Sequence, residues 1–394
     1  AAAYRSAITV SATLTSAGAA PAGRTVTFSL GGSTRRALTD ATGTATATLD
    51  VNVTPRAQAY ALTAAYTGDA STLPAGASSD LTVVRAPTTL EAIAASPQYS
   101  DGASVARLRA NGLTLNEQPV VITRNGVSIA TVTDFNGEVR FDTMDFGTGA
   151  GAGTAPLTVE YPGNDRYAAA SLALTSEVRQ ENGSLVLTQL GPQPTGSVTF
   201  TATAAQSADG SLGDLRRATV TFTFTPDGGA PFTLVAPVDA TGASTLTVTL
   251  APGLYQVTAR LSGDFTSDPA GMTLPVYDAN ASVTGGGWVI AGGDSTGVPL
   301  GGKTTFGFVA KYAKDGVTAT GNLKVHAKSA KGKDDDTDDQ AKANGSVKFK
   351  ATTFDWLVIA GQGAAFTGTG TVNGVAGYRF RVDVVDDGDD LFVI

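Results

Sequence analysis

The sequence predicts an all-β protein, with three β-sandwiches of one type in tandem and a distinct β-sandwich or barrel at the C-terminal end. Apolar residues alternate with threonine and serine over short segments, as they do between Val26 and Leu30. An Asp-x-x-Gly turn, followed by a second glycine turn, occurs three times. After residue 278 this pattern stops and a different one begins. These three observations define the predicted fold class.

The first unit shows the pattern most clearly. Residues Thr39–Asp69 open with the turn Asp40–Gly43, continue through two alternating apolar runs and close at Gly68–Asp69. Tyr60 to Tyr66 is one of the predicted strands, and the abundant threonines suit an exposed β face.

The second and third units repeat this order of features. The second has its turn at Asp134–Gly137, its closing glycine at Gly163 and a strong hairpin signal at Asn125–Gly126. The third has Asp239–Gly242 and Gly263. A repeat length near 100 residues, with about seven short strands per unit, is typical of an immunoglobulin-like β-sandwich.

A chain of 394 residues is too long for one hydrophobic core. We therefore predict four domains, at residues 1–86, 87–180, 181–278 and 279–394, and name them repeat 1, repeat 2, repeat 3 and the C-terminal domain. The predicted linkers are short, at Arg85–Pro87, Gln180–Gly183 and Asp278–Asn280. Linkers of a few residues favour a semi-rigid rod or a curved chain.

Residues 1–278 resemble bacterial Ig-like repeats. The resemblance rests on Val26–Phe28, on Thr39–Leu49 and on Tyr66–Asp69 in repeat 1. Repeat 2 keeps part of the closing motif, and its matching residues are Tyr161, Gly163, Asp165 and Tyr167. Repeat 3 departs from it, with Leu261 in place of the tyrosine. The resemblance implies a fold class and no activity.

The C-terminal domain resembles the post-COAP domain of secreted bacterial proteins. The matching segments are GGGW at 285–288, KTTFGFVAKY at 303–312 and TTFDWLVIAGQGAAFTGTGTVNGVAGYRF at 352–380. This resemblance implies a small all-β accessory domain without assigned catalysis. Alternation from Phe306 to Tyr312 and from Tyr378 to Val384 independently predicts strands. The acidic insert Asp334–Asp339 departs from the family pattern.

Composition narrows the function classes. The chain has no cysteine, which excludes disulfides and thiolate sites, and its net charge of −8 argues against nucleic acid as the main partner. All ten lysines lie between Lys303 and Lys350, so Lys–Asn amide cross-links are excluded in the three repeats. No apolar run is long enough to span a membrane as a helix. The N-terminal residues lack signal-peptide features, so we expect a removed signal peptide or a fragment.

Calcium is the one cofactor that the sequence suggests. Asp334, Asp336 and Asp338 have the spacing that opens a calcium loop, but Asp339 and Gly345 stand where an EF-hand needs Gly and Glu. The two interpretations are a solvated loop and loose calcium binding. Both also apply to the cluster Asp386–Asp390.

The two tryptophans, Trp288 and Trp356, are predicted to anchor the core of the C-terminal domain, because an indole buries a large apolar area. The alternative is that they stack on a ligand such as a glycan.

Other motifs give no catalytic site. Gly297–Thr304 has P-loop spacing, but a strand pattern follows it where a P-loop needs a helix. His326 is the only histidine, and we expect it on a strand face. The closing-turn acids are expected to accept backbone N–H bonds within their turns, and these acids are Asp69, Asp165 and Asp264. We therefore predict that the chain is not an enzyme.

The predicted function is that of a non-catalytic extracellular structural protein of a bacterial cell surface: a spacer or stalk, or a subunit of a layer, fibre or complex. Its expected partners are other cell-surface proteins, copies of itself, or glycans. Nucleic acid is not expected to be a partner. Free strand edges would make the contacts, including the apolar run Leu391–Ile394. One alternative is an adhesin or carbohydrate-binding module that uses the C-terminal domain. Another is the accessory tail of a larger secreted hydrolase.

Overall fold

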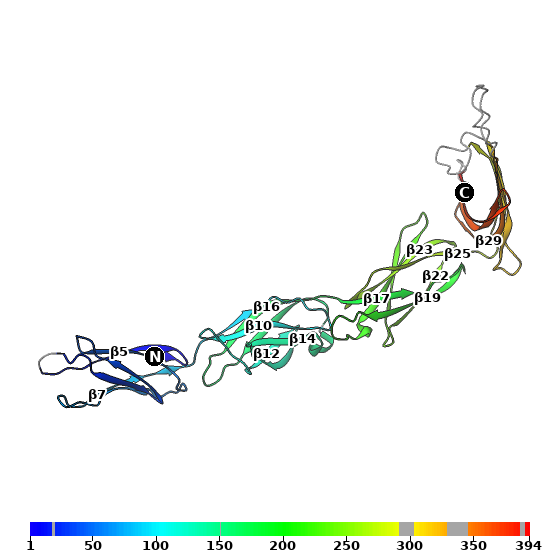
Figure 1. The fold of residues 1–394 in the computed structure, drawn as a ribbon. Helices are drawn as coiled ribbons and strands as arrows, with labels where there is room; N and C mark the ends of the chain where they lie inside the picture. Colours follow the sequence, from blue (N-terminus) through cyan, green and yellow to red (C-terminus); the bar gives the residue numbers. More distant parts are fainter. Residues whose placement is uncertain (18–19, 150, 291–302, 329–345, 387–390) are drawn as a thin grey trace, which may run out of the picture. The chain divides into compact units, whose positions relative to one another are not determined.

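The computed structural model describes residues 1–17, 20–149, 151–290, 303–328, 346–386 and 391–394. Their regular secondary structure is β strand, apart from two short 3-10 helices, η1 (Thr143–Gly149) and η2 (Leu215–Arg217) (Figure 1). The predicted all-β fold class is therefore confirmed. The chain divides into two compact units, one of Ala1–Glu181 with Ala208–Gly213, the other of Asn182–Ser207 with Asp214–Ile394. Each unit is described by itself.

Repeat 1 consists of two facing sheets and a short parallel pair. The two-stranded sheet contains β2 (Ala7–Thr13) and β5 (Thr44–Asp50). The four-stranded sheet has the order β4 (Ser33–Leu38), β3 (Thr25–Leu30), β6 (Tyr60–Tyr66) and β7 (Ala75–Leu81). The parallel pair joins β1 (Ala2–Ala3) to β8 (Val83–Val84). Alternate residues of both sheets, such as Phe28 and Leu49, form the core.

Repeat 2 has two four-stranded sheets. One contains β9 (Thr88–Ala92), β10 (Gly102–Ala110), β11 (Leu113–Thr114) and β14 (Glu138–Asp142). The other has the order β13 (Val127–Val132), β12 (Pro119–Arg124), β15 (Gly153–Tyr161) and β16 (Ala170–Val178). The predicted hairpin turn at Asn125–Gly126 joins β12 to β13, and both residues have positive φ.

Repeat 3 has a four-stranded and a five-stranded sheet. The first has the order β22 (Ala243–Leu250), β19 (Gly196–Gln206), β17 (Glu181–Leu187) and β24 (Phe265–Thr266). The second has the order β18 (Gln193–Pro194), β25 (Ala270–Tyr277), β23 (Gly253–Gly263), β20 (Ala218–Pro226) and β21 (Phe232–Pro237). Phe200 and Phe224 meet edge to face in its core, with ring centroids 5.2 Å apart.

The Asp-x-x-Gly turns have the same hydrogen bonds in all three repeats. In repeat 1, Asp40 Oδ1 accepts the backbone N–H groups of Thr42 and Thr44 at 2.8 and 3.0 Å. The equivalent donors are Asn136 and Glu138 on Asp134 in repeat 2, and Thr241 and Ala243 on Asp239 in repeat 3. The Thr42 hydroxyl and these backbone groups hold the pKa of Asp40 below its usual value. The aspartate carboxylate therefore stabilises the turn through these hydrogen bonds.

The last residue of each Asp-x-x-Gly turn is a glycine whose carbonyl oxygen is hydrogen-bonded to the facing strand. Gly43 has a φ of 79°, and its carbonyl oxygen accepts the N–H of Leu14 at 2.8 Å. The same bond joins Leu108 to Gly137 and Ala204 to Gly242. A Cβ on Gly43 would lie 2.5 Å from the Leu14 carbonyl oxygen, so the position admits only glycine.

The C-terminal domain is a single antiparallel sheet in which the strands follow their order in the chain. These strands are β26 (Ser282–Ile290), β27 (Lys303–Tyr312), β28 (Ala319–Ala327), β29 (Val347–Ala360), β30 (Gly363–Val372), β31 (Val375–Val385) and β32 (Leu391–Val393). The sheet curves strongly (Figure 1), and Phe392 of β32 stacks on Phe306 of β27 with ring centroids 3.8 Å apart. Among the described residues, the domain is therefore one curled, barrel-like sheet rather than a sandwich.

The inner face of this sheet is aromatic. Phe366 is fully buried and packs against Phe308 and Phe380 at ring-centroid distances of 5.4 and 6.2 Å. Tyr277, the last residue of β25, stacks on Tyr312 at 4.3 Å and joins the same core.

Tyr312 makes the stability of this domain depend on pH. Its hydroxyl donates to the Leu357 carbonyl at 2.9 Å, and burial raises the pKa of Tyr312 to about 12. A raised pKa means that its stabilising contribution is present below the unfolded value near 10 and is lost as pH rises through 12. We expect unfolding free energy to fall between pH 10 and 12 by up to about 2 kcal/mol more in the native protein than in Tyr312→Phe. Equal pH profiles for the two proteins would contradict this prediction.

Candidate functional site

The outer face of the C-terminal sheet is defined by its register. Residues directly opposite each other on neighbouring strands share a face, and Trp288 on β26 lies opposite Thr305 on β27. Thr305 lies opposite His326, and His326 lies opposite Lys348. Since Phe306 and Phe308 point into the core, these four residues lie on the outer face.

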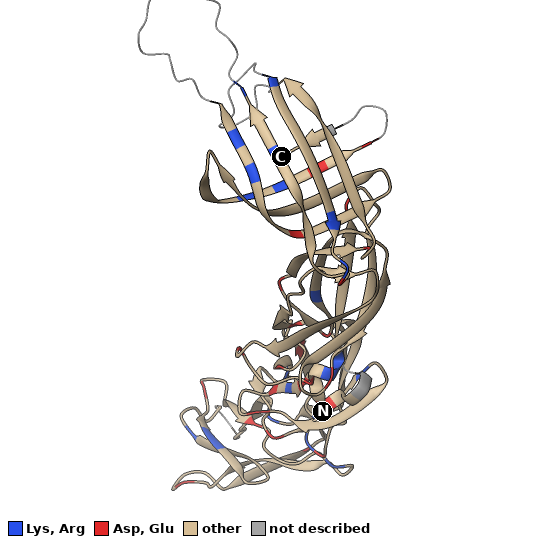
Figure 2. Ribbon diagram, turned by 90° about the vertical axis from the view of Figure 1, so that its right-hand side faces the viewer, with Lys and Arg blue, Asp and Glu red and all other residues tan. Residues whose placement is uncertain are grey.

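This outer face is strongly basic. Figure 2 shows that Lys and Arg recur along the strands of the C-terminal sheet, and the strand register gives their face. The basic residues that the register places on it are Lys303, Lys311, Lys324, Lys348, Lys350, Arg379 and Arg381. Arg379 pairs with Asp355 at 2.9 Å and Arg381 with Asp383 at 2.8 Å. Within the described residues, none of the five lysines forms an ion pair, and Lys324 lies directly opposite Lys350. The face therefore carries an excess of positive charge on a chain that is acidic overall.

Trp288 is exposed at the edge of this face. Its side chain is 58% exposed, and the Lys303 ammonium lies 4.4 Å from its ring centroid, in cation–π geometry. Trp356 is half-buried on the same face, opposite Thr367. The prediction that both tryptophans anchor the core is wrong, because the register turns both side chains outward and phenylalanines fill the core.

Glycines explain why Trp288 faces out. Gly285 and Gly287 lie opposite Phe308 and Phe306 on the inner face. A Cβ on Gly285 would lie 2.5 Å from the Phe308 ring, so the missing side chain makes room for that ring. The alternation then places the indole on the outer face.

Several predicted site residues lie outside the described part of the chain. These are the calcium candidates Asp334, Asp336 and Asp338, four residues of the cluster Asp386–Asp390, and most of the P-loop-like segment Gly297–Thr304. Among the residues that are described, no group of three or more His, Asp or Glu side chains could hold a metal ion. The calcium interpretation therefore stays a prediction.

The closing turns differ among the repeats. In repeat 1, Asp69 Oδ1 accepts the N–H groups of Ser71 and Thr72, both at 2.9 Å, as predicted. The Ser71 N–H and the Thr72 hydroxyl, which donates to the same oxygen at 2.8 Å, hold the pKa of Asp69 well below its usual value.

In repeat 2, the acceptor in this turn is Asn164, which binds the N–H groups of Arg166 and Tyr167 at 2.9 Å. The prediction for Asp165 is therefore wrong, because the residue directly after the glycine occupies the accepting position. In repeat 3, Asp264 forms an ion pair with Arg217.

Comparison with known proteins adds little to this geometry. No protein-family model and no curated protein matches the chain. Among solved structures it is similar to a tetra-tandem repeat from the extending region of a large adhesion protein, at 14% identity and a TM-score of 0.31, over 96% of this chain and 95% of that one. It is also similar to an ectodomain fragment of ICAM-5, at 12% identity and a TM-score of 0.29, over 100% of this chain and 97% of that one. Matches this distant carry no argument about function.

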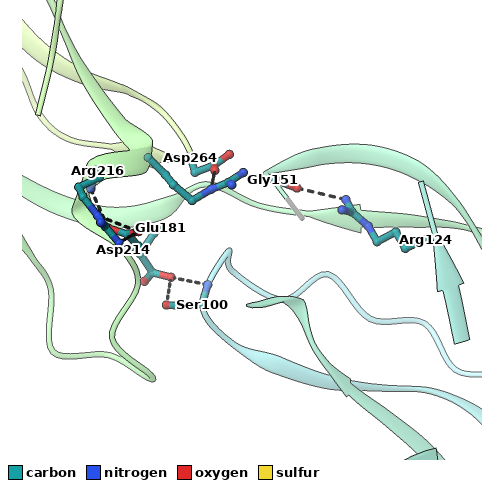
Figure 3. A network of polar contacts seen from close by, with 8 residues as sticks. Ser100, Arg124, Gly151, Glu181, Asp214, Arg216 and Asp264 are labelled. Atoms are coloured by element: carbon teal, nitrogen blue, oxygen red, sulfur yellow. Dashed lines mark hydrogen bonds and ion pairs between the residues drawn. The ribbon is translucent and has the colours of Figure 1, made fainter. Parts of the chain in front are cut away.

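Two buried polar residues of the first unit were not anticipated from the sequence. Glu181 is fully buried, and its Oε2 accepts the backbone N–H of Ser100 at 3.2 Å (Figure 3). Arg124 is also buried, and it donates to the carbonyl oxygen of Gly151 at 3.2 Å (Figure 3). It also donates to the hydroxyl of Ser176 at 3.0 Å. Both satisfy backbone groups inside the unit.

No helix of the described residues has the length and apolar character needed to cross a membrane.

Proposed function

We propose that this chain is a non-catalytic structural protein of a bacterial cell surface, acting as a spacer or stalk or as a subunit of a layer, fibre or complex. The main support is that the aspartates of the repeated Asp-x-x-Gly turns form hydrogen bonds within their own turns. Asp40, Asp134 and Asp239 all bind their own backbone, so the repeated feature of the sequence builds a framework.

The same proposal gives the C-terminal domain the role of an accessory domain of the post-COAP kind, exposed outside the cell. Its partners would be other surface proteins or copies of the chain. Electron tomography of producing cells, with a gold-labelled tag on the chain, tests the proposal. Label arranged in a layer, in fibres or at a fixed height above the envelope is expected. Label without any fixed spacing or height would contradict a structural role.

A second candidate function is adhesion through an anionic glycan, and the exposed Trp288 beside Lys303 favours it. An indole offers a flat surface on which a sugar ring stacks, and the lysines of the outer face supply positive charge for carboxylate or sulfate groups.

We expect the chain to bind an immobilised sulfated polysaccharide in a salt-dependent manner. Trp288→Ala and Lys324→Ala should each weaken this binding about fivefold or more, since each contact is worth about 1 kcal/mol. Lys314→Ala removes an exposed lysine from the turn between β27 and β28 and is the matched control. Circular dichroism would verify folding. Equal affinities for Lys324→Ala and Lys314→Ala would rule out a specific role of the outer face.

A further inference from the structure

The glycines within the strands of the C-terminal sheet are of two kinds. On the inner face, a Cβ on Gly285, Gly321 or Gly370 would lie 2.5, 2.9 or 2.4 Å from a phenylalanine ring, so these glycines make room for the core. On the outer face, Gly307 in the middle of β27 is exposed, and a Cβ there would meet no atom within 4 Å. Glycine inside a strand lowers stability, and it often marks a place where a ligand approaches the backbone. Packing within the sheet therefore gives no reason for glycine at this position.

Gly307 belongs to a part of the outer face that has no side chains. It lies directly opposite Gly286 of β26, and we name these two residues the glycine strip. Only backbone atoms of β27 come within 4 Å of a Cβ on Gly286. The exposed Trp288, two positions further along β26, borders the strip on the same face. A sugar ring that stacks on this indole can therefore rest on the backbone of the two strands.

Lysines continue the row that the glycine strip begins. Gly307 lies opposite Lys324 of β28, and Lys324 lies opposite Lys350 of β29. Lys348 is two positions from Lys350 on the same face. Like charges directly opposite each other destabilise a sheet, and none of these three lysines forms an ion pair with a described residue. The lysines therefore favour anionic groups of an external ligand.

The strand spacing relates the indole to the lysines. Neighbouring strands lie about 4.8 Å apart, so Trp288 on β26 and Lys324 on β28 are separated by roughly 10 Å across the sheet. A polysaccharide presents sugar rings and acidic groups in succession along one chain. A chain that crosses the strands over the glycine strip can therefore contact the indole and the lysines at the same time.

We propose that the outer face binds an acidic polysaccharide whose chain lies across the strands. One sugar ring stacks on Trp288, the glycine strip supports the chain, and acidic groups contact Lys324 and Lys350. Gly307 is then a specificity-determining residue, because a side chain at this position would hold the polysaccharide off the sheet. This inference rests on the second candidate function, adhesion through an anionic glycan, and adds the direction of the glycan and the role of Gly307.

Gly307→Val tests the proposal without changing any charge, by binding of the native chain and the variant to immobilised dextran sulfate. The variant is expected to fold, because its Cβ has room and valine suits a strand. We expect binding about tenfold weaker or worse, because a polysaccharide held off the strip loses its contacts with both Trp288 and Lys324. Ser282→Val adds the same side chain to the outer face opposite Lys311, outside the strip, and it should leave binding unchanged.

Soluble competitors distinguish a fitted chain from simple charge attraction. Dextran sulfate should displace the native chain about fivefold more effectively than polyphosphate of equal charge, since polyphosphate has no ring to stack on Trp288. Equal competition by the two polyanions, or equal affinities of the native chain and Gly307→Val, would overturn this inference alone. Absence of dextran sulfate binding by the native chain would end the second candidate function as well. If Gly307→Val failed to fold by circular dichroism, Gly307→Ala would give the same test with a smaller loss.

Discussion

Replacing Phe366 by alanine is expected to lower the unfolding free energy of the C-terminal domain by about 3–5 kcal/mol. Phe366 is fully buried, and its ring lies 5.4, 6.0 and 6.2 Å from the rings of Phe308, Phe354 and Phe380. Its removal leaves a cavity lined by three aromatic rings, two from the neighbouring strands β29 and β31 and one from β27, and a curled sheet cannot collapse around it without breaking its hydrogen bonds.

Tryptophan fluorescence measures this effect selectively. The chain has two tryptophans, Trp288 and Trp356, and both lie in the C-terminal sheet, so urea titrations followed at the indole report on that domain. Phe135→Ala is the matched control, because that ring is 82% exposed, and it should leave the transition unchanged. An unchanged midpoint for Phe366→Ala would mean that the aromatic face does not hold the sheet together.

Gly242→Ala is expected to destabilise repeat 3 by about 2–3 kcal/mol. Gly242 has a φ of 84°, where an L side chain is strained, and a Cβ there would lie 2.3 Å from the carbonyl oxygen of Ala204. Relieving this collision would move the Asp239 turn away from β19 and break the hydrogen bond from the Ala204 N–H to the Gly242 carbonyl.

Gly228→Ala separates the cost of backbone strain at positive φ from the cost of the collision between a Cβ and a neighbouring atom. Gly228 also has a positive φ, 69°, but a Cβ at this position would meet no atom within 4 Å, so the substitution should cost about 1 kcal/mol. Hydrogen exchange followed by mass spectrometry would show faster exchange over β19 in Gly242→Ala than in Gly228→Ala. Identical exchange over β19 would contradict the proposed tie between turn and strand.

Local turn chemistry was predictable from the sequence. The Asp-x-x-Gly turns and the Asn125–Gly126 hairpin were identified because their hydrogen bonds and positive φ values involve residues close in the chain. The closing turn of repeat 2 failed at one position, where Asn164 rather than Asp165 is the acceptor. The side-chain oxygens of Asn and Asp can both accept the backbone N–H groups of such a turn. The prediction considered only the acidic residue and therefore named Asp165.

Facing directions and non-local contacts were harder to predict. Gly285, Gly286 and Gly287 carry no side chain, so β26 has no readable alternation, and the direction of Trp288 follows only from its pairing with β27. The contact between Glu181 and Ser100 joins residues 81 positions apart, and no pattern in the sequence indicates it.

The central claim is that this chain acts outside the cell as a structural module. Antibodies raised against residues 1–394 and applied to intact producing cells test it most directly. The account predicts that intact cells are labelled and that brief protease treatment of those cells removes the label. Labelling that requires permeabilised cells and survives protease on intact cells would contradict it.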